Sequence, residues 1–165
     1  MSKVFAMLKA DGPGPDLSAD QLIFAPLIGS WNVIHRTLAA DGSVTEREGE
    51  WHFAWILGGR GVQDVLFAKG ALPGARNTAL RCYDESINAW RVTAMQSIGG
   101  EFVSLVARRR GDKIVQEGAA HDGSTRERWT FSDITAKSFR WTGESSSAAA
   151  DEWRRHQQML ATRQR

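Results

Sequence analysis

The chain of 165 residues has a single cysteine and no long apolar run. One cysteine excludes a disulfide within the chain, and with it the disulfide-dependent folds of small secreted proteins. No run reaches the roughly 18 apolar residues that a membrane-spanning helix needs. The apolar run at 4–8 is also too short for the core of a secretory signal peptide. These absences predict a cytoplasmic protein without a membrane partner.

The chain also lacks a strong excess of charge of either sign, with a formal net charge of +2 at pH 7. Arginines cluster at 108–110, at 126–128 and at 154–155, close to acids or to predicted turns. Such clusters are typical of solvated strand ends rather than of a binding track for phosphates. No nucleic-acid partner is therefore expected.

Motifs for metal binding and for nucleophilic catalysis are missing as well. The four histidines fall on four different predicted strands without the short spacing of paired metal ligands, and they are His35, His52, His121 and His156. The chain has no Gly-x-Ser-x-Gly motif and no phosphate-binding Gly-x-x-x-x-Gly-Lys motif. No metal site is expected, and the sequence names no reaction.

Large aromatic side chains, in contrast, are abundant. Seven tryptophans and seven phenylalanines stand against one tyrosine, a balance that brings apolar area with few hydroxyl groups. Trp51, Phe53 and Trp55 fall on one face of an extended strand, with mainly polar residues between them. Gly58-Gly59 then marks a sharp corner before the next strand. This pattern predicts a sheet with an aromatic interior.

The order of the remaining signals predicts one domain behind a short arm. Residues 1–17 include the glycine- and proline-rich segment 11–16, which predicts a flexible arm. Ser18 and Gln21 form a capping-box pattern ahead of a short helix that plugs one end of the domain. From Gly29 onward, about ten short strands alternate with turn signals. Residues 18–165 are therefore predicted to form a single all-β, antiparallel barrel, since closure removes exposed strand edges.

Several segments resemble a known class of barrels. Gly29-Ser30-Trp31, with Arg163 late in the last strand, resembles the lipocalin and calycin signature, in which the tryptophan packs under a late arginine. The run 55–60 followed by Gln63, and Phe139-Arg140-Trp141 followed by Trp153, look like a bacterial lipocalin-like family of unassigned function. The turn at 146–151 departs from that family, which commonly has glycines and a lysine there. The resemblance implies a calycin-type barrel with a ligand cavity and implies no activity.

Strand alternation sorts the polar residues by face. If the aromatic faces point inward, the polar residues that share the interior are His35, Gln63, Gln96, Glu127, Arg155 and Gln157. A single β-bulge would reverse the faces beyond it. A buried polar group without a partner costs on the order of 1–3 kcal/mol, so these groups either bond one another or hold a ligand. A buried pair of Glu127 with Arg155 is expected, and Gln63 is the expected ligand-orienting residue.

The first functional hypothesis is the binding of a small hydrophobic ligand, aromatic or polycyclic, because stacking on tryptophans favours flat molecules. The predicted ligand-binding residues are Trp51, Phe53, Trp55, Gln63, Phe67, Trp90, Gln96, Phe102, Trp129, Phe139, Trp141, Arg155 and Gln157. The alternative is an acid–base enzyme, such as a cyclase, isomerase, hydratase or lyase, with Glu127 and His35 as catalytic candidates. An apolar wall raises the pKa of a carboxyl group towards the range of a general acid.

Two further alternatives stay open. No cofactor is expected, but His156 lies roughly where haem-binding calycins such as nitrobindin place an axial histidine. Against haem, the segment after Gly29 lacks that family's further glycines, and His156 is expected on the face opposite Trp153. The arm at 1–17 or an exposed sheet face could bind a second copy of the chain, and such a homodimer is compatible with either function.

Overall fold

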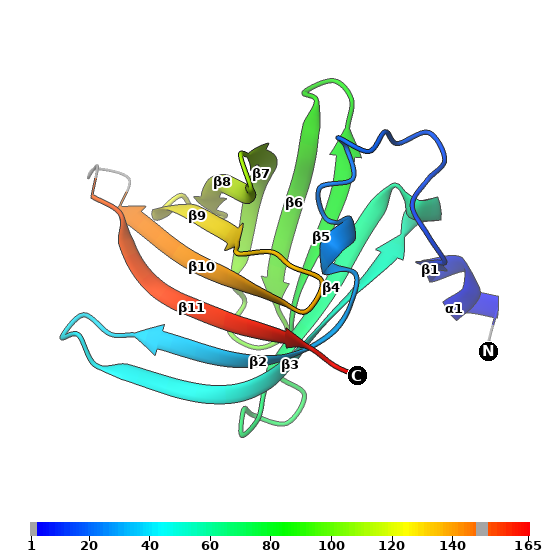
Figure 1. Ribbon diagram of the computed structural model, residues 1–165. Helices are drawn as coiled ribbons and strands as arrows, with labels where there is room; N and C mark the ends of the chain where they lie inside the picture. The colour runs from blue at the N-terminus through cyan, green and yellow to red at the C-terminus, as the bar shows by residue number, and fades with distance from the viewer. Residues whose placement is uncertain (1–2, 148–151) are drawn as a thin grey trace.

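The chain folds into a closed β-barrel (Figure 1). The computed structural model describes residues 3–147 and 152–165, without the side chain of Ala6. Its antiparallel barrel strands are β2 (Gly29–Leu38), β3 (Val44–Ile56), β4 (Gly61–Ala68), β5 (Asn77–Asp84), β6 (Ala89–Gln96), β7 (Phe102–Arg110), β8 (Lys113–Ala120), β9 (Thr125–Ser132), β10 (Ser138–Ser147) and β11 (Arg154–Arg163). Strand β3 pairs with both β2 and β4, which closes the barrel. The predicted all-β, antiparallel barrel is confirmed, while the unusual turn at 146–151 lies largely outside the described residues.

One end of the barrel is closed by the segment that precedes β2. Phe24 and Leu27 are fully buried there, beside and within a short 3₁₀ helix, η1 (Ala25–Leu27). Two indoles hold this segment by donating to its carbonyl groups. Trp31 donates to the carbonyl oxygen of Leu27 and Trp90 to that of Gln21, each over 2.8 Å. The end of the barrel is therefore plugged by apolar side chains whose backbone is fixed by the core.

The short helix predicted for this segment is only partly formed. The backbone N–H of Ser18 donates to Oε1 of Gln21 over 2.7 Å, which is one half of a capping box. Turns follow instead of an α-helix, and Pro26 sits inside η1, where its missing N–H removes one helical donor. The segment nevertheless plugs the barrel end as predicted.

Arg163 fastens the plug to the barrel. Its guanidinium lies over the ring of Trp31, 4.0 Å from the centroid, and donates to the carbonyl oxygens of Pro26 and Ile28 over 3.0 and 2.9 Å. The opposing Gly29 has φ +126°, and a Cβ there would lie 2.5 Å from Nη1 of Arg163. The contact implied by the calycin resemblance is thus present, and the glycine before the tryptophan makes room for it.

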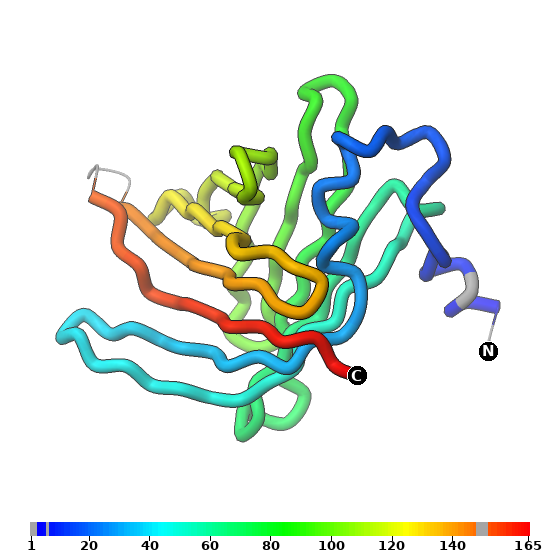
Figure 2. Tube along the Cα trace, viewed as in Figure 1, coloured from blue at the N-terminus to red at the C-terminus, as the bar shows by residue number. Residues whose placement is uncertain are grey.

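The N-terminal residues form elements that the sequence pattern does not predict. Helix α1 (Lys3–Leu8) leads into a two-residue strand, β1 (Lys9–Ala10), which pairs with the end of β3 at Ile56 and Trp55. The chain then crosses the corner between β3 and β4, where the N–H of Gly14 donates to the carbonyl of Gly59 over 2.9 Å. The arm consequently lies beside the barrel wall, as the chain trace shows (Figure 2).

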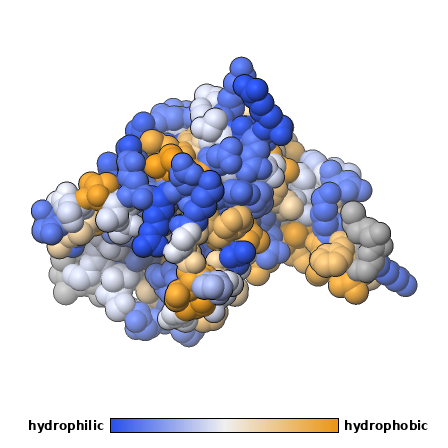
Figure 3. Space-filling view, turned by 90° about the horizontal axis from the view of Figure 1, so that it is seen from below, coloured by the Kyte–Doolittle hydropathy of each residue, from blue (hydrophilic) through white to orange (hydrophobic). Residues whose placement is uncertain are grey.

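Helix α1 exposes apolar side chains. Val4, Phe5, Met7 and Leu8 are between 61% and 75% exposed, and orange apolar surface gathers over this arm at the right of the space-filling view (Figure 3). In the described part of the chain, no helix has both the length and the apolar character to cross a membrane. The flexibility of the arm and its use in a homodimer stay predictions.

Candidate functional site

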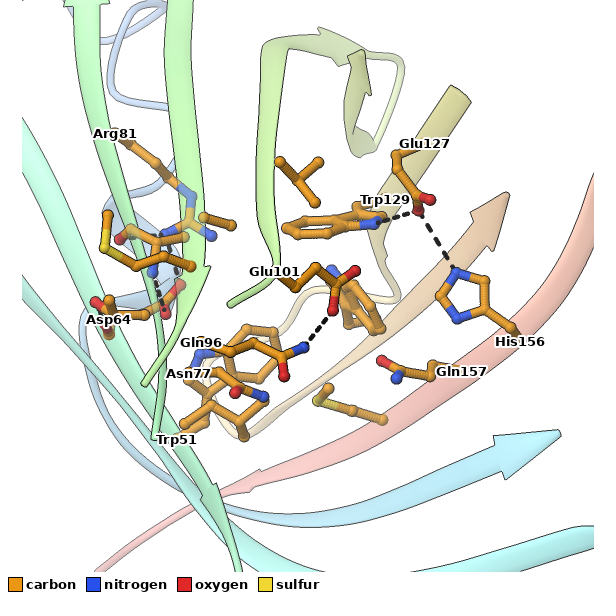
Figure 4. Close-up of a pocket in the computed structure, with 18 residues that line it drawn as sticks. Trp51, Asp64, Asn77, Arg81, Gln96, Glu101, Glu127, Trp129, His156 and Gln157 are labelled. Atoms are coloured by element: carbon orange, nitrogen blue, oxygen red, sulfur yellow. Dashed lines mark hydrogen bonds and ion pairs between the residues drawn. The ribbon is translucent and has the colours of Figure 1, made fainter. Parts of the chain in front are cut away.

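The barrel lumen is filled at the plugged end and hollow towards the other. Phe53, Phe131 and Phe139 pack together near the plug, with ring centroids 5.6 to 6.2 Å apart. Beyond them lies a cavity of about 100 Å³, lined from strands β3 to β7 and β9 to β11 (Figure 4). Asn77 and Glu101 belong to its wall and are exposed, so the cavity opens to solvent on their side.

Three tryptophans, Trp51, Trp129 and Trp141, form the aromatic wall of the cavity. The ring of Trp141 meets Trp129 and Trp51 edge to face, with centroids 5.6 and 6.2 Å away. A Cβ on Gly143 would lie 2.6 Å from Cη2 of Trp141, so the absence of a side chain there leaves space for this ring. Edge-to-face packing fixes the rings at a steep mutual angle, and the cavity wall is therefore preformed.

A carboxylate and an imidazole face each other on the same wall. Glu127 is only 6% exposed. Its Oε2 accepts the Nε1–H of Trp129 over 3.2 Å, and its Oε1 accepts the hydroxyl of Thr125 over 2.8 Å. Nε2 of His156 lies 3.6 Å from the same Oε2 (Figure 4). The cavity thus contains a held carboxylate beside an imidazole, two groups of the kind that transfer protons in general acid–base catalysis.

A β-bulge in β11 puts His156 in this position. Gly143 of β10 pairs with Gln157, but the next residue, Glu144, pairs with Arg155, so His156 is the extra residue of the bulge. His156 and Gln157 both line the cavity, whereas Arg155 is exposed outside it. The predicted inward orientation of Arg155 is therefore wrong, and so is its pairing with Glu127. In the part of β11 that precedes the bulge, inward and outward faces are therefore exchanged relative to the predicted alternation.

A second polar cluster lies in the barrel interior and is not predicted from the sequence. Nη1 of Arg81 lies 2.6 Å from Oδ2 of Asp64, and the two side chains are 1% and 4% exposed. Oδ1 of Asp64 accepts the backbone N–H of Ala79 over 3.0 Å, and Nε of Arg81 donates to Oε1 of the buried Gln116 over 3.2 Å. The guanidinium also lies 5.0 Å from the ring centroid of Phe24. Asp64 and Arg81 line the cavity, so its innermost polar surface is an internally paired charge.

The mouth carries further polar groups. Gln96 lines the cavity, as predicted, and its Nε2 donates to Oε2 of Glu101 over 2.5 Å. His35 lies on the inward face of β2 with the buried Trp31 and Val33, also as predicted. It borders a neighbouring recess rather than the main cavity.

Burial lowers the pKa of His35 below its ordinary value. The nearby charge of Arg47 lowers this pKa further, while a hydrogen bond with Gln157 acts in the opposite direction. A neutral His35 is therefore favoured, and the structure places it beside Gln157 instead of beside Glu127. The two catalytic candidates of the sequence do not form one constellation, because His156 occupies the position next to the carboxylate.

The predicted ligand-binding residues separate into three groups. Those that line the cavity are Trp51, Gln96, Trp129, Trp141 and Gln157. Those buried in the packed interior without lining it are Phe53, Trp55, Trp90 and Phe139. Those that the structure places on the outside of the barrel are Gln63, Phe67, Phe102 and Arg155. The ligand-binding role of the first group stays a prediction.

Register explains why the face assigned to β4 is wrong. Leu66 lies opposite Trp51, and Asp64 lies opposite Phe53. Because directly opposed residues of an antiparallel pair share a face, Leu66 and Asp64 point inward with the aromatic residues of β3. Gln63 therefore points outward, where its Nε2 donates to Oγ1 of Thr78 over 3.1 Å. The same alternation carries Phe67 to the outside.

The signal for Asp64 and Arg81 is present in the sequence but depends on that register. Val62, Asp64 and Leu66 alternate, as do Ala79, Arg81 and Tyr83. Once β4 is aligned on β3, Asp64 and Arg81 fall on the inner face of neighbouring strands. His156 carries no such signal, because the bulge interrupts the alternation. Within residues 3–147 and 152–165, no three His, Cys, Asp or Glu side chains gather as a metal-binding group.

Comparison with known proteins finds similarity in structure only. No protein-family model matches the chain, and no curated protein sequence matches it. Rv2717c from M. tuberculosis superposes with a TM-score of 0.61 at 16% identity, covering 91% of this chain and 100% of its own. The S-type phycobiliprotein lyase CPES from Guillardia theta superposes with a TM-score of 0.58 at 6% identity, covering 91% of this chain and 94% of its own. Together with the closed barrel, these similarities show that the chain shares its fold with both proteins, while its assignment to the lipocalin-like calycins and to one bacterial family stays a prediction.

Proposed function

We propose that this protein binds a small hydrophobic ring compound in the barrel cavity. The observation that carries the proposal is the wall of Trp51, Trp129 and Trp141 around a hollow that opens to solvent beside polar groups. Such a wall offers flat apolar faces together with a few groups that orient a ligand. One protein of similar fold is a phycobiliprotein lyase, but analogy of fold is weak support for function, and the proposal rests on the cavity.

The size of the cavity limits the ligand. Its volume of about 100 Å³ is small beside the pockets of roughly 300–1,000 Å³ that hold drug-sized molecules. On the plug side, the cavity is bounded by the packed rings of Phe53, Phe131 and Phe139. We therefore assign to this site a ligand of one or two rings rather than a large polycyclic compound.

Titration with the neutral two-ring probe 1-aminonaphthalene, which is uncharged at pH 7 and fits the size assigned to the ligand, tests the proposal. Saturable probe fluorescence and quenching of tryptophan fluorescence are expected. Ala94→Phe, inside the cavity, should reduce probe affinity at least about tenfold by filling the hollow. Ala54→Phe is the matched control, because Ala54 belongs to a groove outside the barrel. Equal binding by both variants, or no saturable binding by the native chain, would contradict the proposal.

An acid–base enzyme is the second candidate function, and the pair Glu127 with His156 favours it. The carboxylate is buried and held by Trp129 and Thr125, and the imidazole nitrogen lies 3.6 Å away on the cavity wall. In this proposal Glu127 removes a proton from carbon next to a carbonyl group of a ring substrate, and His156 supplies a proton to the developing enolate oxygen. His35, the other candidate from the sequence, lies too far along the mouth to line this cavity.

Hydrogen exchange in a simple ring ketone tests the second candidate. With 2-tetralone in D₂O, proton NMR should show exchange of the protons next to the carbonyl at a rate above that of buffer. Glu127→Gln should abolish the added rate, whereas Glu46→Gln, on an exposed part of β3, should leave it unchanged. An unchanged rate in Glu127→Gln would remove the enzymatic assignment and leave the binding function intact.

Haem is a poorer candidate for the same cavity. Nε2 of His156 faces the carboxylate of Glu127 at 3.6 Å instead of open space. The cavity of about 100 Å³ is also far smaller than a porphyrin requires. The residues present do not fit haem as an occupant, and no step of the proposed chemistry passes through it.

A further inference from the structure

A second hollow adjoins the main cavity at the open mouth of the barrel. This recess of about 350 Å³ is lined from β2, β3, β4, the start of β5 and the segment that joins β4 to β5. Leu66 and Asn77 line both hollows. Gln157 of the cavity wall (Figure 4) also forms a hydrogen bond with His35 of the recess. One ligand can therefore extend from the cavity into the recess.

The side chain of Arg47 lines this recess from β3. Arg47 lies directly opposite His35 of β2, and directly opposed residues of an antiparallel pair share a face. His35 is on the inward face with Trp31 and Val33. Arg47 also precedes the buried Trp51 by four residues, an even number, which gives the same inward face. The charge of Arg47 acts on the imidazole, because it lowers the pKa of His35. The guanidinium therefore belongs to the mouth of the barrel and not to its outer surface.

Arg47 has no anionic partner in the part of the chain that the structure describes. The two acids that flank it in sequence lie on the opposite face of β3. Glu46 is paired with Arg36 at 2.5 Å, and Glu48 is paired with Lys69 at 2.7 Å. The described lining of the recess includes no carboxylate. A positive charge without a counter-charge thus faces the hollow.

The other residues of the recess offer both donors and apolar surface. Thr37 and Thr45 lie directly opposite each other in its wall, and their hydroxyl groups can donate to an anionic oxygen, as the guanidinium can. Leu66, Ala71 and Ala75 form an apolar part of the same wall. The recess thus combines donors for an anion with apolar surface for a short chain that carries it.

The main cavity has the opposite electrostatic character. The carboxylates of Asp64, Glu101 and Glu127 line it. The guanidinium of Arg81 also lines it, but this group is already engaged by Asp64 at 2.6 Å. An anionic group would meet like charge in the cavity and an unpaired cation in the recess. The two hollows therefore distinguish the two ends of a ligand by charge.

We infer that the ligand held in the cavity carries a short tail ending in a carboxylate, which extends into the recess and is bound by Arg47. The inference rests on the proposed binding function and deepens it by naming the class of ligand, a ring compound with an acidic side chain. Trp51 and Arg47 are four residues apart on β3, roughly 13 Å at about 3.3 Å per residue. The long arginine side chain covers part of this distance, so a tail of about three methylene groups is expected to reach it.

Two matched pairs of compounds test the inference by competition against 1-aminonaphthalene at pH 7. The long pair is 4-(1-naphthyl)butanoate and its uncharged amide. The short pair is 1-naphthoate and its amide, in which the polar group is attached directly to the ring and stays in the cavity. The long acid should bind about three- to tenfold more tightly than the long amide, a gain limited by the exposure of Arg47 to solvent. The short acid should bind no more tightly than the short amide, because it meets the carboxylates of the cavity.

Arg47→Gln removes the cation and keeps a polar side chain. In this variant the affinity ratio of long acid to long amide should fall to about one. The affinity for the uncharged 1-aminonaphthalene should stay at the native value, which shows that the cavity is intact. Arg36→Gln is the matched control, because it removes the same charge from the neighbouring residue pair of β2 and β3, where the guanidinium is bonded to Glu46 on the outer face. That variant should keep the native ratio.

The outcomes separate the inference from the function on which it rests. Equal binding of long acid and long amide by the native chain would overturn the inference and leave the binding function standing. An equal preference for the acid in the short pair would do the same, and so would an unchanged ratio in Arg47→Gln or an equal loss in Arg36→Gln. Failure of every compound and of the probe to bind would overturn the proposed function itself.

Discussion

Glu127 of β9 and His156 of β11 meet across the intervening strand β10, with Oε2 and Nε2 3.6 Å apart. Gly143 of β10 leaves the space that the imidazole and a neighbouring indole occupy. A Cβ at that glycine would lie 3.3 Å from Cε1 of His156 and 2.6 Å from Cη2 of Trp141. One missing side chain therefore supports both the carboxylate–imidazole pair and the aromatic wall.

Gly143→Ala is expected to disturb this arrangement. The new methyl group must displace the buried Trp141 ring or the backbone, and such overpacking costs about 1–3 kcal/mol of unfolding free energy. Urea unfolding should show this loss, and near-UV circular dichroism should show a changed tryptophan environment. Gly12→Ala is the control, since a Cβ at Gly12 meets nothing within 4 Å. A Gly143→Ala variant as stable as Gly12→Ala would mean that the glycine is not required for the packing of this wall.

Arg81 and Asp64 support a second prediction. Arg81→Met leaves the carboxylate of Asp64 buried and unpaired, which should lower the unfolding free energy by about 3–5 kcal/mol. The double variant Asp64→Leu with Arg81→Met should recover much of this loss, because no charge is then left buried alone. Urea unfolding measures both effects.

An exposed ion pair provides the control for this pair. Arg36 and Glu46 lie on the surface, with side chains 38% and 52% exposed, and Glu46→Gln should change the unfolding free energy by no more than about 1 kcal/mol. If Arg81→Met lowered the unfolding free energy no more than Glu46→Gln does, the interior ion pair would stabilise the fold no more than the exposed one.

Local patterns in the sequence were sufficient to predict the architecture of the barrel. The alternation of Trp51, Phe53 and Trp55 predicted an inward aromatic face, and all three residues are buried. Turn signals at regular spacing predicted an antiparallel barrel. The contact between Trp31 and Arg163 was implied by the resemblance of Gly29-Ser30-Trp31 and Arg163 to the calycin signature. These features depend on residues close in sequence or on a motif, so they can be derived without knowledge of tertiary packing.

The site was less predictable because two non-local features decide it. The first is the register of β4 on β3, which turns Asp64 inward and Gln63 outward and depends on the length of the corner at 57–60. The second is the bulge at His156, which depends on how β10 and β11 fit together and leaves no mark in the alternation. Glu127 was found because neither feature affects the face of β9.

Arg163 supports a third prediction, on the plugged end of the barrel. Arg163→Lys keeps the charge but loses the planar group that stacks on Trp31 and donates to the carbonyl groups of Pro26, Ile28 and Ala136. The unfolding free energy should fall by about 1–3 kcal/mol, a value typical for lost hydrogen bonds to charged donors.

The same substitution at an exposed site controls for the chemical change. Arg140 has a side chain 48% exposed and a single ion pair, with Asp133, so Arg140→Lys should leave stability within about 0.5 kcal/mol of the native chain. Similar stabilities of the two lysine variants would show that the plug does not depend on the guanidinium of Arg163.

The unfolding free energy of the chain is expected to depend on pH through His35. In the folded chain, the pKa of His35 lies below the ordinary histidine value of 6.5. Burial is the larger cause, and the charge of Arg47 is the smaller one. In the unfolded chain the imidazole has its ordinary pKa and binds a proton more readily as the pH falls through about 6.5. Protonation therefore favours the unfolded chain, so the contribution of His35 to stability is intact above about pH 6.5 and is lost as the pH falls towards the folded pKa.

His35→Gln isolates this contribution from other acid-sensitive groups. The unfolding free energy of the native chain should fall more steeply between about pH 7 and pH 5 than that of the variant, as measured by urea unfolding at each pH. His121→Gln, at an exposed position, should keep the native slope. Proton NMR provides the direct check on the cause. A measured pKa of His35 at or above 6.5 would contradict the predicted effect of burial and Arg47, and equal slopes for the native chain and His35→Gln would show that this residue does not link stability to pH.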